Sequence, residues 1–155
     1  MAKATTLAEY QALANVRFLI RRFLNNTENA ARAVGIEPQQ YLGLLQLRGL
    51  PPGQEPTIRA LADRLQLRHN SVVELVNRME KRGLFRREQA AGDRRCILLR
   101  VTPRGEKLLD QLVRHRIAEL RVTCPELVRS LSAAVGLELK RGKARRASRD
   151  SESSR

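Results

Sequence analysis

Tryptophan is absent from this 155-residue sequence, and aromatic residues together make up only 3% of it. A core must therefore be built from Leu, Val, Ile and Ala, which favours helices that pack through aliphatic faces. Two cysteines, Cys96 and Cys124, are too few for a disulfide framework, so we expect ordinary thiols in a reducing compartment. No apolar run approaches the roughly 20 residues of a membrane span, and residues 1–6 carry no apolar signal core. These absences predict a soluble, cytoplasmic protein.

The sequence also lacks the patterns that carry catalysis. We find no glycine-rich phosphate loop, no nucleophile with a credible base and no cluster of metal ligands. His69 and His115 are the two histidines, and neither has a second ligand at metal spacing. We therefore expect no enzymatic activity, no metal and no cofactor.

Basic residues outnumber acidic ones by 30 to 16, a net charge of +14. Such a charge attracts polyanions, which leaves nucleic acid, an anionic membrane surface or acidic protein tails as partners. Residues 59–104 hold twelve basic and five acidic side chains, a net of +7. Half of the charge thus falls in less than a third of the chain, which a uniformly solvated surface would not produce.

Apolar residues recur at spacings of three and four along most of the chain, which predicts amphipathic helices. The first helix is expected over residues 7–34, far longer than the mean of about 11–12 residues, and such a helix often packs against another subunit. A shorter sixth helix is expected to start at Pro125. The other four helices are expected from Pro38 to Gly49, from Thr57 to Leu65, from Asn70 to Arg82, and from Pro103 onward.

Between the fourth and fifth helices the periodicity changes to that of strands. Residues 84–88 and 96–101 predict a hairpin, and the polar stretch 89–95 predicts a long, basic loop between its strands. The third and fourth helices match a helix-turn-helix, whose second helix enters the major groove of DNA. A basic hairpin directly after it makes the arrangement a winged helix.

The start of the fourth helix holds the residues that we expect at base edges or phosphates: His69, Asn70 and Ser71. His69 could equally be an ordinary exposed residue. Val73 and Glu74 share a helix face with Asn70, so Val73 could contact a thymine methyl and Glu74 a cytosine amino group. Alternatively, Glu74 only pairs with Arg78 one turn later. Phosphate contacts are expected from Arg78, Arg86, Arg87 and Arg94.

Several segments together resemble the MarR (multiple antibiotic resistance regulator) family over about residues 7–135. They are Pro38-Gln39-Gln40-Tyr41, residues 58–65, residues 72–84, Asp93-Arg94-Arg95, and residues 99–105, which contain Thr102-Pro103-Arg104-Gly105. Their order and spacing make the combination specific. Two positions depart from the pattern, because Val73 and Glu74 stand where many members carry Thr and Arg.

The resemblance implies a mainly α fold with a small β wing and a two-fold homodimer in which the first, fifth and sixth helices of both chains interlock. It implies one domain over residues 1–136, with dimerisation helices at about 7–35 and 103–136 and a DNA-binding lobe at about 38–102. It also implies that Arg95, held by Asp93, enters the minor groove, where a narrow groove attracts Arg. Residues 137–155 hold seven basic and three acidic residues with few apolar ones, which predicts a disordered tail.

These observations predict a sequence-specific regulator of transcription that binds a palindromic operator in double-stranded DNA as a ligand-responsive repressor. The resemblance suggests a small aromatic or phenolic effector, whose binding residues the sequence does not identify. The alternative is a winged-helix module that binds RNA or protein, although few aromatic residues are free for stacking on RNA bases. The candidate DNA-binding residues are Arg68, His69, Asn70, Ser71, Val73, Glu74, Arg78, Arg86, Arg87, Asp93, Arg94 and Arg95.

Overall fold

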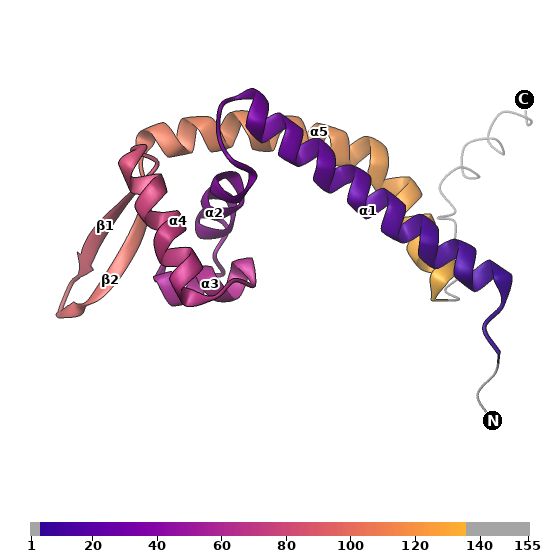
Figure 1. Cartoon of the computed structure of the whole chain (residues 1–155), viewed down its shortest axis with the longest axis horizontal. Coiled ribbons are helices and arrows are strands. Elements are labelled where there is room, and N and C mark those ends of the chain that lie inside the picture. Colours follow the sequence, from indigo (N-terminus) through magenta and orange to yellow (C-terminus); the bar gives the residue numbers. More distant parts are fainter. Residues whose placement is uncertain (1–3, 136–155) are drawn as a thin grey trace, which may run out of the picture. The chain divides into compact units, whose positions relative to one another are not determined.

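The computed structural model describes residues 4–135, apart from the side chains of Asp93 and Arg94, so the predicted tail over residues 137–155 lies outside the described residues. The elements are named in Figure 1. They are α1 (Leu7–Ala33), α2 (Pro38–Arg48), α3 (Ile58–Leu65), α4 (His69–Lys81), β1 (Phe85–Ala90), β2 (Asp93–Val101) and α5 (Pro103–Ala134). The prediction of a mainly α fold with a small β wing is confirmed.

The described chain forms two compact units, each of which can be described by itself. Residues 21–122 form the first, which we call the lobe, and residues 4–20 with 123–135 form the second, the end unit. The predicted single domain over residues 1–136 stays a prediction. No helix in the described part of the chain is both long and apolar enough to span a membrane.

Capping residues set the bounds of the helices in the lobe. Pro38 opens α2, where its missing N–H costs no hydrogen bond, and the side chain of Gln40 accepts a bond from the backbone N–H of Glu37 at 3.2 Å. Thr57 caps α3 by accepting a hydrogen bond from the N–H of Ala60 at 3.1 Å. Gly83 closes α4 with a φ of +66°, a conformation in which residues with a Cβ are strained.

The core of the lobe is aliphatic, as the scarcity of aromatic residues predicts. Val72, Leu75, Val76 and Met79 form the buried face of α4, at the spacings of three and four that predict an amphipathic helix. They belong to one apolar cluster with residues of every other helix and of the hairpin, and their burial holds α4 in place. Other buried members are Ala31, Ile36, Tyr41, Leu44, Leu47, Leu61, Ala62, Leu84, Phe85, Leu99, Leu109 and Leu112.

The hairpin is longer than predicted, and the expected loop over residues 89–95 is wrong. Strands β1 and β2 pair antiparallel from Phe85 opposite Val101 to Gln89 opposite Ile97, and an irregularity in register follows. Only two residues connect the strands, and Gly92 among them adopts a φ of +92°. The polar residues of this segment are compatible with strands because backbone hydrogen bonds hold a hairpin without an apolar pattern at its end.

The separate sixth helix predicted at Pro125 is also wrong, because α5 continues through this residue to Ala134. Proline removes one backbone hydrogen bond and costs about 3 kcal/mol inside a helix. The turns of a 32-residue helix on either side compensate for one lost bond.

Thr102 and Gly105 join the hairpin to α5. The Thr102 hydroxyl donates to the carbonyl of Gly83 at 2.6 Å and accepts from the N–H of Gly105 at 3.1 Å. A Cβ on Gly105 would lie only 2.5 Å from the carbonyl oxygen of Leu84 and 2.8 Å from Val101. Glycine is therefore the residue type that lets α5 start directly against the base of the wing.

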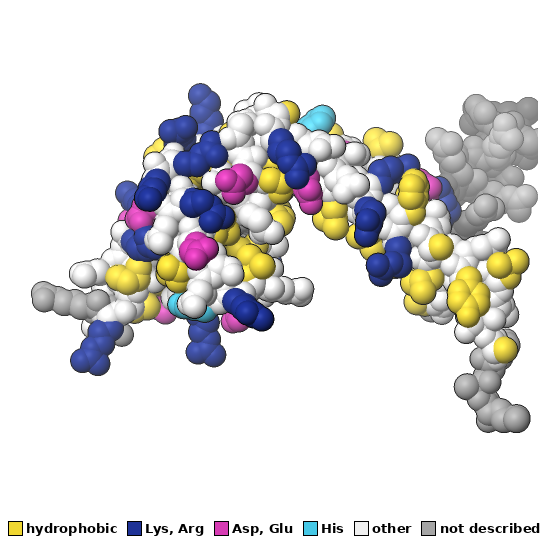
Figure 2. Space-filling view, viewed as in Figure 1, with side chains coloured by type: hydrophobic (Ala, Val, Ile, Leu, Met, Phe, Trp, Pro, Cys, Tyr) yellow, Lys and Arg dark blue, Asp and Glu magenta, His cyan; other side chains and the backbone are white. Residues whose placement is uncertain are grey.

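In the end unit, the first and last turns of the long helices lie together. Val16 and Leu19 are buried, and the Asn15 amide donates to the hydroxyl of Ser130 at 2.6 Å. The apolar face of α1 is only partly buried in this unit, since Leu13 remains 56% exposed. Yellow side chains are visible along this unit in Figure 2. Its exposed apolar residues include Leu7, Tyr10, Leu13, Phe18, Ile20, Val128, Leu131 and Val135.

Candidate nucleic-acid interface

The outer face of α4 presents a row of polar side chains at helical spacing. Asn70, Glu74 and Asn77 are exposed, and Val73 between them is half-buried. Arg68, His69 and Ser71 are also exposed at the start of the helix. The residues predicted to face DNA on this helix therefore do lie on the surface of the lobe. The base or phosphate contacts of these residues stay predictions.

Asn77 belongs to this face and was missed by the sequence reasoning. It stands seven residues after Asn70, so the same spacing of three and four that grouped Asn70, Val73 and Glu74 also reaches Asn77. That spacing was the available signal. The resemblance drew attention to the departures at Val73 and Glu74 instead.

Arg78 is oriented by Glu37, not by Glu74. Its Nη2 lies 3.7 Å from an Oε atom of Glu37, and both side chains are about half exposed. In the described part of the chain, Glu74 takes part in no ion pair or hydrogen bond. The carboxylate of Glu74 is thus available on the outer face of α4.

Arg87 links the wing to α4. Its guanidinium forms an ion pair with Glu80 and donates to the side-chain oxygen of Asn77 at 2.7 Å, while its backbone N–H donates to Glu80 at 3.2 Å. The side chain is only 28% exposed. We predicted a phosphate contact for Arg87. In this structure its guanidinium is engaged with α4, and the phosphate contact stays a prediction.

The face of the hairpin opposite to Arg87 is exposed to solvent and carries Arg86 and Arg100. Arg86 pairs with Glu88 at 2.7 Å, and Arg100 on the neighbouring strand pairs with the same carboxylate at 3.0 Å. Arg95 is exposed on β2 near the turn. The side chains of Asp93 and Arg94 lie outside the described residues, so the pairing of Asp93 with Arg95 stays a prediction.

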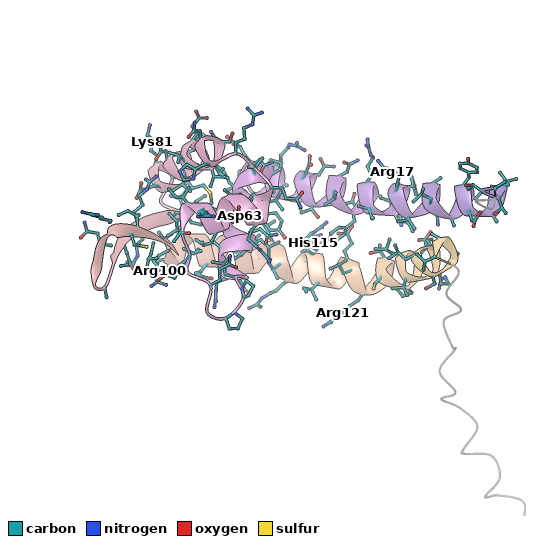
Figure 3. All side chains as sticks on the ribbon, turned by 90° about the horizontal axis from the view of Figure 1, so that it is seen from below. Arg17, Asp63, Lys81, Arg100, His115 and Arg121 are labelled. Atoms are coloured by element: carbon teal, nitrogen blue, oxygen red, sulfur yellow. The ribbon has the colours of Figure 1, made fainter. Side chains whose placement is uncertain are left out.

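The wing and the start of α4 extend toward the same side of the lobe. In Figure 1 the turn of the hairpin and the α3–α4 junction both point downward. Figure 3 looks at the molecule from below, with Arg100 on the hairpin and Asp63 on α3. Lys and Arg side chains outnumber acidic ones on the visible surface of the lobe (Figure 2). A helix and a basic hairpin on one side fit adjacent grooves of a duplex.

A second polar group lies buried inside the lobe, between α1, α2 and α5. Arg116 is 7% exposed and forms an ion pair with Glu119, which also accepts a hydrogen bond from Asn26 at 2.6 Å. Burial raises the pKa of Tyr41, and the positive charge of Arg116 partly offsets this. Among the described residues, the Nε of Arg116 has no hydrogen-bond partner. A buried guanidinium with an unused donor suits an acceptor group of a ligand.

The helix pair, the hairpin and the exposed face of α4 define a winged-helix protein. Residues 34–95 match the model of the MarR family. AbsC, a MarR family transcriptional regulator from Streptomyces coelicolor, has a similar fold, with a TM-score of 0.67 and 22% identity over 86% of this chain and 93% of that one. The chain thus has a winged-helix fold, and residues 34–95 are similar to the MarR family.

Two further proteins are similar to this chain. A mutant of MepR from S. aureus, solved bound to an oligodeoxyribonucleotide, superimposes with a TM-score of 0.58 at 21% identity over 86% of this chain and 95% of that one. The HTH-type transcriptional regulator YsmB of Bacillus subtilis, itself uncharacterized, is 30% identical over 86 residues, which are 56% of this chain and 57% of YsmB. The chain spans about half the length of the curated relatives that it matches.

Proposed function

We propose that this protein is a transcriptional regulator that binds double-stranded DNA at specific sequences as a homodimer. The observation that carries the proposal is the exposed face of α4 beside a basic wing, with both extending toward one side of the lobe. Two such lobes related by a two-fold axis would read the two halves of a palindromic operator. The family match and the names of the relatives support this proposal.

In this proposal the protein acts by binding and not by catalysis, and it works in the cytoplasm. Base edges are contacted from Asn70, Val73 and Glu74, while arginines outside that row contact phosphates. Among the described residues, no three His, Cys, Asp or Glu side chains are grouped as metal ligands. The relatives are named as regulators, which agrees with a role without chemistry.

The test is selection of bound duplexes from a random-sequence DNA pool, followed by gel shifts at one stated salt concentration. We expect a palindromic motif and binding to it at least about a thousandfold tighter than to random duplex. A structured RNA of equal length is the competitor. Equal affinity for the RNA, or no enriched motif, would overturn the proposal in favour of an RNA- or protein-binding module.

We further propose that the protein is a repressor released by a small aromatic or phenolic effector. The buried group around Tyr41 and Arg116 supports this, because the unused Nε–H of Arg116 can donate to a phenolate or carboxylate oxygen. A panel of phenols and aromatic acids, added to the complex with the selected duplex, tests it. Release by one compound, and its loss in the Arg116→Lys variant, is expected. No release by the panel would count against it.

A further inference from the structure

Asn77 continues the exposed row of Asn70 and Glu74 on α4, and the proposed function assigns it no role. Its side-chain oxygen accepts a hydrogen bond from Nη2 of Arg87 at 2.7 Å. Arg87 belongs to β1, so this bond connects the wing to α4. Among the described residues, the Asn77 side chain makes no other hydrogen bond. A residue in the row that faces DNA is therefore oriented by the wing.

The chemistry of Arg87 fixes which way the Asn77 amide is turned. A guanidinium only donates hydrogen bonds, so the atom of the amide that contacts it must be the oxygen. The amide nitrogen then lies on the other side, and its two N–H groups have no partner among the described residues. Asn77 thus has two donors available to a ligand, while its acceptor is engaged.

Further contacts of Arg87 keep the amide in this orientation. The guanidinium also forms an ion pair with Glu80, whose carboxylate accepts a hydrogen bond from the backbone N–H of Arg87 at 3.2 Å. Arg87 is half-buried. Turning the Asn77 amide around would leave a half-buried charged donor without an acceptor, which is unfavourable. We therefore expect Asn77 to meet a duplex as a donor.

We propose that Asn77 contacts a base in the major groove and that Arg87 determines which base it prefers. This inference rests on the proposed function, because it requires α4 to lie in that groove. An asparagine that can turn freely pairs with adenine, since it donates to N7 and accepts from the N6 amino group. An asparagine that only donates fits guanine best, because N7 and O6 of guanine are neighbouring acceptors. It fits cytosine worst, because the N4 amino group is itself a donor.

Asn77→Asp tests the contact, because it removes the donors and preserves the size and shape of the side chain. The carboxylate still accepts from Arg87, so the link between the wing and α4 is kept. Duplexes are selected from a random-sequence pool with the parent and with the variant. At one position of each half-site, we expect the parent to favour guanine over cytosine by at least about fivefold, and the variant to reverse this order.

Asn29→Asp is the matched control. The side-chain oxygen of Asn29 also accepts from an arginine, Arg32 at 3.3 Å, but both residues lie on α1. This variant adds the same negative charge and should select the parental motif. Equally weaker binding of Asn77→Asp to every duplex would indicate a phosphate contact, and an unchanged motif would indicate a structural role. Either result would overturn the proposal.

Arg87→Met tests the positioning role of Arg87, because methionine has a similar length and no donor. The Asn77 amide can then turn, so the position that Asn77→Asp alters should change from guanine to adenine. Loss of a positive charge lowers the affinity for all duplexes, so the measured quantity is the order of the four bases. Guanine retained at that position, in a variant whose thermal midpoint shows that it is folded, would refute the role of Arg87.

The selection with the parent separates this inference from the proposed function. A parent that enriches no motif would overturn the proposed function, and this inference with it. A parent that enriches a motif in which Asn77→Asp replaces a base other than guanine would overturn this inference alone. Exchange of guanine for cytosine in Asn77→Asp, and for adenine at the same position in Arg87→Met, is the expected result.

Discussion

The guanidinium of Arg78 lies 3.7 Å from the carboxylate of Glu37, the residue that precedes α2. Glu74 precedes Arg78 by one turn of α4, and the sequence offered it as the alternative partner. Because Arg78 pairs with Glu37, Glu74 keeps its carboxylate on the exposed face beside Asn70 and Asn77. This arrangement favours the hypothesis that Glu74 contacts a base.

Glu74→Gln is expected to change the preferred nucleotide at one position in each half-site. A carboxylate accepts a hydrogen bond from cytosine N4, whereas the amide of Gln also donates and pairs well with adenine. The change at that position should be about 1–3 kcal/mol. Site selection on variant and parent measures it, with Asp110→Asn on α5 as a control that leaves the motif unchanged. An unaltered motif with weaker binding to every duplex would mean that no base is read by Glu74.

Arg95→Ala is expected to weaken binding to the selected duplex about tenfold or more, because the side chain is predicted to enter the electronegative minor groove. The thermal midpoint should hardly change, since the side chain is exposed. Fluorescence anisotropy at fixed salt checks the affinity. Arg114→Ala removes the same charge from an 80% exposed side chain on α5 and serves as the control. Equal affinities of both variants would place Arg95 outside the groove.

Gly105→Ala is expected to lower the free energy of unfolding by about 1–3 kcal/mol, because the new methyl group would overlap the Leu84 carbonyl. The sign of the change in the free energy of unfolding tests this overlap, because replacing Gly by Ala in an unobstructed helix raises that free energy by about 0.5–1 kcal/mol. Urea denaturation measures the change. Gly43→Ala is the comparison, and its cost should be smaller because its new Cβ meets the flexible side chain of Met79 at 3.0 Å. A stabilised Gly105 variant would contradict this account.

The protein is expected to be a dimer at micromolar concentration, because α1 leaves large apolar side chains exposed, among them Leu7, Leu13 and Phe18, and clustered exposed apolar residues mark protein–protein interaction sites. Light scattering measures the mass. Leu13→Glu, in the exposed part of the apolar face of α1, should shift the equilibrium toward monomer, whereas Gln11→Glu on the same helix should not. A monomeric parent would defeat this prediction.

The helices of the lobe could be predicted closely from the sequence, because their ends carry residues with strong local preferences. Thr57, Pro38 and Gly83 each fix a helix end through their own backbone or side-chain chemistry. The buried face of α4 followed from the spacing of its apolar residues. These signals are local, so they do not depend on the rest of the fold.

The errors concern features that depend on more distant contacts. Residues 89–95 are polar and suggested a loop, yet strand pairing across the hairpin extends them. Pro125 suggested a break, yet α5 continues on both sides of it. The partners of Arg78 and Arg87 could not be predicted either, because Glu37 and Glu80 come close to them only when the lobe is folded.

The contacts of Arg87 with Glu80 and Asn77 hold the wing at a fixed distance and orientation relative to α4. If the helix reads the major groove and the wing reads the neighbouring minor groove, the two sequence elements of a half-site must stand a fixed number of base pairs apart. One inserted base pair would displace the second element by about 3.4 Å along the duplex. It would also rotate that element by about a tenth of a turn. A bioinformatic search for target promoters can therefore treat the spacing within a half-site as invariant and allow variation only between half-sites.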